Sequence, residues 1–154
     1  MSVKSPLYES PIKIIYRKLP KLLGQGIDWP LLDVGLKYKN IAIAPKMLAL
    51  VDSGASDSIL DPEVAKFLGF NLEKIDKKIG GGTSASGRYS YWTLPEPVEL
   101  NIYERKFTVD FIVIDSPNQM WSCILGHNSI FRLSKILFNT HKKYFKIILR
   151  GDIN

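Results

Sequence analysis

The chain has 154 residues, of which 45% are hydrophobic, and this length and composition allow one hydrophobic core but exclude two. The formal net charge of +6 and the pI of about 9.4 are compatible with an anionic partner, but such an excess also serves solubility. The one cysteine, Cys123, excludes an intrachain disulfide and a cysteine metal cluster, and it favours a reducing compartment.

Residues 1–26 predict an N-terminal arm or edge strand, and residues 27–154 predict a single domain. Prolines interrupt the first segment, where only residues 12–16 form a short β-prone run. Its basic residues favour a solvated surface over nucleic-acid binding. Lys4 and Glu9 interrupt the apolar core that a signal peptide needs, and no apolar run reaches the roughly 18 residues that cross a bilayer. We expect a soluble, cytoplasmic protein that does not associate with a membrane.

The next part of the chain predicts strands around one short helix. Residues 30–39 alternate apolar and polar side chains, as in a half-buried strand, and residues 46–51 form a continuous apolar run typical of a strand buried on both faces. Asp61 suits the N-cap of a helix and Pro62 its first turn, and Gly69 ends it after about two turns.

The remainder predicts a mainly β class with one or two short helices. A glycine and serine cluster at residues 80–87 precedes an aromatic segment. Three further β-prone runs follow, at residues 97–103, 106–114 and 121–125. A second short helix is expected near Asn128, and residues 135–149 predict a hairpin whose turn contains His141.

Asp52 follows the apolar run in the stretch LALVDSGASDSIL. Taken alone, Asp52, Ser53 and Gly54 are ordinary turn residues, because aspartate bonds nearby amides and glycine permits positive φ. The strand before them is among the most hydrophobic in the chain, so we expect Asp52 to be deeply buried. A buried carboxylate without a partner is costly and is therefore a candidate reacting group.

Three features in this order resemble the retropepsin-like (retroviral-type) aspartic proteases. Residues 51–60 resemble the family's apolar strand that ends in Asp-Thr/Ser-Gly-Ala, and residues 124–128 resemble its later apolar pair and glycine before a short helix. The glycine cluster between them resembles the family's flap hairpin. The resemblance spans roughly residues 29–149, and it implies a closed or sandwiched β-barrel with a glycine-rich flap hairpin.

The resemblance implies an aspartic endopeptidase with Asp52 as its catalytic residue. Peptide hydrolysis of this kind needs two carboxylates that share one proton and activate one water. The chain has a single Asp-Ser/Thr-Gly triplet, since Asp115 and Ser116 are followed by Pro117. We therefore expect a homodimer in which two copies of Asp52 meet on a two-fold axis.

Further site residues follow from the same resemblance. It implies that Ser53, Gly54 and Ala55 support the pair of carboxylates. The implied substrate-binding residues are Asp57, Gly81, Gly82, Thr83 and Tyr89. The expected partners are a peptide or protein substrate and a second copy of the chain. No cofactor or metal is expected, because the two histidines, His127 and His141, lie in different elements.

The sequence departs from the family pattern at two positions. Many retroviral members carry an arginine after the second glycine, and this arginine bonds an aspartate just beyond the active-site loop. His127 and Ser56 stand at these two positions, so the ionic lock between them is absent. A second hypothesis is a catalytically silent dimer of the same fold that binds peptides or another protein.

Overall fold

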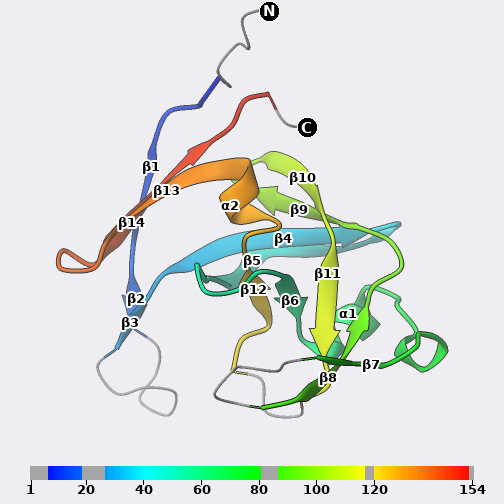
Figure 1. Cartoon of the computed structure of the whole chain (residues 1–154). Coiled ribbons are helices and arrows are strands. Elements are labelled where there is room, and N and C mark those ends of the chain that lie inside the picture. Colours follow the sequence, from blue (N-terminus) through cyan, green and yellow to red (C-terminus); the bar gives the residue numbers. More distant parts are fainter. Residues whose placement is uncertain (1–6, 19–26, 81–86, 117–119, 153–154) are drawn as a thin grey trace, which may run out of the picture.

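The computed structural model describes residues 7–18, 27–80, 87–116 and 120–152. The predicted mainly β class is confirmed (Figure 1). The elements in chain order are β1 Ile12–Ile15, β2 Arg17–Lys18, β3 Asp28–Trp29, β4 Leu31–Tyr38, β5 Ile41–Val51, β6 Ser58–Leu60, α1 Pro62–Phe67, a 3-10 helix at Leu72–Lys74, β7 Lys78–Gly80, β8 Tyr89–Thr93, β9 Val98–Ile102, β10 Arg105–Val109, β11 Phe111–Ile114, β12 Cys123–Leu125, α2 Ile130–Leu133, β13 Ser134–Asn139 and β14 Tyr144–Leu149.

Nine strands form one curled sheet in the order β10-β9-β4-β5-β12-β6-β11-β8-β7 (Figure 1). At its centre β12 runs parallel to β5 and antiparallel to β6. Because the carboxyl ends of parallel neighbours meet at the same edge of a sheet, the residues after Val51 lie beside the residues after Leu125. This pairing brings together the two sequence stretches that resemble the protease family.

A smaller sheet of three strands, in the order β1-β14-β13, lies beside the curled sheet (Figure 1). It contains the predicted C-terminal hairpin, which is confirmed, and Lys143 in its turn has a φ of 58°. Phe145, Ile147 and Leu149 alternate along β14 and are buried in the hydrophobic core. The short strand β1 pairs antiparallel with β14 along its other edge.

Helix α1 forms where the capping residues predict it. The Asp61 side chain accepts a hydrogen bond from the Glu63 backbone N–H over 2.8 Å, and Pro62 is the first residue of the helix. Gly69 follows it with a φ of +104°, which suits glycine. The predicted second helix is the single turn α2. No helix in the described part of the chain has the length and apolar character needed to cross a membrane.

Two predicted strands differ from the structure. The strand predicted at residues 46–51 begins earlier, at Ile41, and only its last three residues are buried. Its first half pairs with β4, and there the β5 side chains are exposed or half-buried, with Ile43 packed against the edge of the core. The run predicted at residues 106–114 divides at Asp110, because β10 pairs with β9 whereas β11 pairs with β6 and β8.

Candidate active site

Asp52 lies at the carboxyl end of β5, where β5 and β12 end together. Its backbone N–H donates to the Leu125 carbonyl over 3.0 Å. Its Oδ1 accepts from the Gly54 N–H over 2.9 Å, and its carbonyl accepts from the Ala55 N–H over 3.2 Å. These hydrogen bonds close a tight turn and orient the carboxylate. A Cβ at Gly54 would lie only 3.3 Å from Asp52 Oδ1, so the turn is packed against the carboxylate.

The prediction that Asp52 is deeply buried is wrong for the single chain. Val51 is the last buried residue of β5, Asp52 is half-buried, and Ser53 and Gly54 are exposed. The strand leaves the core at this point, so its hydrophobic character does not extend to the residues that follow. In a single chain, the tip of the Asp52 loop is therefore open to a molecule that docks against it.

The loop after β12 packs directly on the Asp52 loop. A Cβ at Gly126 would lie 2.6 Å from the Asp57 carbonyl oxygen and closer still to that of Ala55, so only glycine fits without a shift of the backbone. The backbone N–H of His127 donates to the Ala55 carbonyl over 2.9 Å. The two loops therefore form one unit at the edge of the sheet.

Ser58 joins the two loops from inside the core, where it is fully buried. Its Oγ accepts from the Gly126 N–H over 3.1 Å and lies 2.6 Å from both Asn128 Oδ1 and Ser129 Oγ. Because an amide oxygen can only accept, Ser58 donates to Asn128, and the Ser129 hydroxyl donates to Ser58. Sequence reasoning did not single out Ser58. Its one signal was a small polar residue within the stretch around Asp52 that resembles the family.

His127 reaches the exposed tip of the Asp52 loop with its side chain. Its Nε2 lies 2.6 Å from the Ser53 carbonyl oxygen. A carbonyl only accepts hydrogen bonds, so Nε2 carries a proton and donates it. The imidazole ring stacks on Phe131 of α2, with 4.8 Å between ring centroids and 23° between ring planes.

The sequence-family model of the retroviral aspartyl proteases matches residues 40–150 of the chain. The chain belongs to the retroviral aspartyl protease family. Among solved structures, it is similar to a retropepsin-like aspartic protease from Rickettsia conorii, with 20% identity, a TM-score of 0.57, and coverage of 97% of this chain and 98% of that chain. It is also similar to the retroviral protease-like domain of Ddi1 from Leishmania major, with 21% identity, a TM-score of 0.51, and coverage of 81% of this chain and 91% of that chain.

These two likenesses show that the family member described here has the retropepsin-like fold. The predicted mainly β, retropepsin-like fold is thereby confirmed, as is the resemblance on which it rested, whereas the flap hairpin stays a prediction. No curated protein sequence gives a significant match.

An open hollow of about 470 Å³ borders Asp52 in this retropepsin-like domain. Trp29, Leu50 and Phe138 give it apolar walls, and Ser53 also lines it. Trp29 meets Trp121 edge to face, with 5.2 Å between ring centroids.

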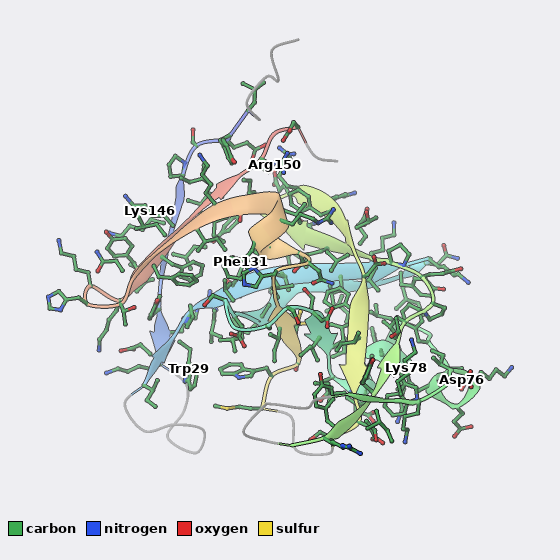
Figure 2. All side chains as sticks on the ribbon, in the orientation of Figure 1. Trp29, Asp76, Lys78, Phe131, Lys146 and Arg150 are labelled. Carbon is green, nitrogen blue, oxygen red and sulfur yellow. The ribbon has the colours of Figure 1, made fainter. Side chains whose placement is uncertain are left out.

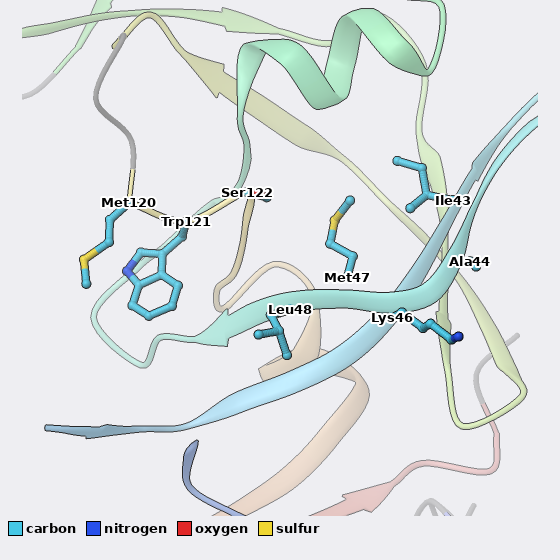
Figure 3. A pocket seen from close by; sticks show the side chains of 8 residues that line it. All are labelled: Ile43, Ala44, Lys46, Met47, Leu48, Met120, Trp121 and Ser122. Carbon is cyan, nitrogen blue, oxygen red and sulfur yellow. The ribbon is translucent and has the colours of Figure 1, made fainter. Parts of the chain in front are cut away.

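Trp121 also lines a second open hollow, of about 570 Å³ (Figure 3). Its other apolar lining residues are Ile43, Ala44, Met47 and Leu48 of β5 and the neighbouring Met120, and Lys46 also lines it. The contact between Trp29 and Trp121 therefore links the hollow beside Asp52 to this second apolar surface.

Asp57 and Tyr89, two of the predicted substrate-binding residues, do not line the hollow beside Asp52. Asp57 is exposed in the loop before β6, and Tyr89 is half-buried at the start of β8, opposite Gly80 in the hairpin of β7 and β8. The expected flap residues Gly81, Gly82 and Thr83 lie outside the described residues. In the described part of this family member, no three His, Cys, Asp or Glu side chains gather as a metal site would require.

Proposed function

We propose that the chain is an aspartic endopeptidase whose catalytic pair consists of Asp52 from each of two copies. The observation that carries this proposal is the Asp52 loop itself. It is the one Asp-Ser/Thr-Gly triplet of the chain, it lies where two parallel strands end, and its carboxylate accepts the Gly54 N–H over 2.9 Å. Membership of the retroviral aspartyl protease family supports the same activity.

The chemistry gives the two copies of Asp52 different tasks. The ionised carboxylate takes a proton from a water molecule as that water attacks the peptide carbonyl, and the neutral carboxyl donates a hydrogen bond to the carbonyl oxygen. One side chain cannot be in both states at once, so a second copy must supply the other. The exposure of Ser53 and Gly54 in the single chain is compatible with two such loops meeting, the Ser53 hydroxyl bracing the opposite loop.

The two hollows provide surfaces for the side chains of a peptide. The walls beside Asp52 and the surface around Trp121 are predominantly apolar, which favours a substrate with large hydrophobic residues near the bond that is cleaved. Asp57, Tyr89 and the residues between β7 and β8 remain proposed substrate contacts, the last of them as a flap that closes over the peptide.

Asp52→Asn tests the proposal with little disturbance of the loop, because an amide oxygen can still accept the Gly54 N–H. We expect the wild type to cleave members of a peptide library at mildly acidic pH and the variant to lose at least about 10³-fold in kcat/KM. Asp76→Asn is the matched control. It removes the same charge from an exposed position far from Trp29 and the hollow (Figure 2).

Equal cleavage by the wild type and Asp52→Asn would contradict the proposal, and so would a wild type that cleaves nothing. Peptide binding without cleavage would favour the silent dimer instead. Sedimentation analysis adds a second test, since a chain that stays monomeric at high concentration cannot form the pair of carboxylates.

A further inference from the structure

We propose that His127 is a positioning residue for the Asp52 loop, and that its hydrogen bond to Ser53 replaces the arginine–aspartate ion pair expected from the family pattern. The effect on catalysis rests on the proposed function. The effect on the order of the loop does not, because it follows from contacts within one chain.

The tip of the Asp52 loop has few other attachments. Gly54 and Ala55 donate their N–H groups to Asp52, so these two hydrogen bonds stay within the turn. Across the described residues, the 2.6 Å contact from His127 Nε2 to the Ser53 carbonyl is the one hydrogen bond that joins Ser53 or Gly54 to another element. Without it, the exposed tip is held by its own turn alone.

The donor itself is held in place at both ends. The His127 backbone N–H is bonded to the Ala55 carbonyl over 2.9 Å, and its ring stacks on Phe131. A chain of aromatic contacts continues from Phe131 to Phe138 and from there to Phe145, with ring centroids 6.4 Å and 6.1 Å apart. Phe145 is fully buried, so the imidazole is connected to the core (Figure 2 labels Phe131). A donor fixed in this way loses little side-chain entropy when it bonds Ser53.

At Ser56, where the family pattern has the aspartate of the ion pair, a backbone hydrogen bond provides the attachment. Ser56 has no carboxylate to offer, but its carbonyl accepts the Asn128 N–H over 3.2 Å. The near side of the loop is thus held by backbone hydrogen bonds, and the tip by the imidazole. Because the acceptor at Ser53 is an uncharged carbonyl, this attachment is less sensitive to salt than an exposed ion pair.

The position of the tip matters because Gly54 orients the carboxylate of Asp52. A displacement of about 1 Å at a reacting group is enough to reduce a rate by about 10²-fold. His127 acts through Ser53 and Gly54 and does not touch the reacting atoms. We therefore expect its loss to lower kcat with little change in KM.

Two substitutions separate the hydrogen bond from the stacking. His127→Gln places an amide nitrogen near the position of Nε2 and keeps a donor for Ser53, whereas His127→Phe keeps a ring against Phe131 and removes the donor. We expect His127→Phe to lower kcat about 10- to 100-fold with KM within about twofold, and His127→Gln to retain most of the wild-type kcat. Equal losses in both variants, or no loss in either, would overturn the proposal.

Amide hydrogen exchange by NMR gives a readout that does not need activity. We expect the Gly54 and Ala55 amides to exchange faster in His127→Phe and at the wild-type rate in His127→Gln. The imidazole ¹⁵N shifts of the wild type should show a protonated Nε2. If the wild type cleaves no peptide but the exchange rates differ as expected, the proposed function fails and the positioning role stands. Identical exchange rates in all three proteins would refute the positioning role whatever the activity.

Discussion

Replacing Gly126 by alanine is expected to separate the two loops of the site. The added Cβ would lie 2.6 Å from the Asp57 carbonyl oxygen, where ordinary contact begins at 3.4 Å, and closer still to the carbonyl oxygen of Ala55. Both obstacles are backbone atoms, which cannot turn away as a flexible side chain does. Overpacking of this kind costs about 1–3 kcal/mol. The shift also strains the hydrogen bond from the Gly126 N–H to Ser58, so we expect the free energy of unfolding to fall by about 3 kcal/mol in total.

Thermal and urea unfolding followed by circular dichroism measure this loss. For a domain of this size, about 3 kcal/mol lowers the melting temperature by about 6–12 °C. Gly151→Ala is the matched control, because its added Cβ would come no closer than 3.4 Å to another residue, and we expect a change within about 0.5 kcal/mol. If Gly126→Ala is as stable as Gly151→Ala, the two loops do not pack as tightly as these distances require.

Two further substitutions test the polar contacts. Ser58→Ala leaves the buried Gly126 N–H and Asn128 Oδ1 without their partner, so we expect urea denaturation to show a loss of about 2 kcal/mol; an unchanged midpoint would contradict the network. The hydrogen bond from the Arg150 guanidinium lowers the pKa of Asp152. The resulting contribution to stability is present above the unfolded pKa of the carboxyl and is lost as pH falls through its folded pKa. Arg150→Gln should therefore raise the Asp152 midpoint in an NMR titration, and a midpoint that does not move would refute this pairing.

Local patterns in the sequence predict much of this fold. The caps at Asp61 and Gly69 locate α1, because capping depends on neighbouring residues only. Two β-prone runs on either side of a polar turn locate the hairpin of β13 and β14. The position of Asp52 at the end of an apolar run likewise predicts its place at the end of a strand.

Features that depend on residues far apart in the sequence could not be predicted from local patterns. The break at Asp110 arises because the chain changes neighbours within the sheet, and the apolar run gives no sign of it. The half-burial of Asp52 depends on where the curled sheet ends. The contact between His127 and Ser53 joins residues 74 positions apart, so neither residue's local sequence indicates it.

Cys123 gives this fold a practical property for spectroscopy. It is fully buried in β12 between two other strands, and burial raises the pKa of its thiol, so the thiolate that reacts with labels is scarce. It is also the sole cysteine of the chain. A cysteine introduced at the exposed turn of β13 and β14, as in His141→Cys, could therefore be spin-labelled without replacement of the native cysteine. In the proposed homodimer, the label-to-label distance in solution would then report directly how the two copies are arranged.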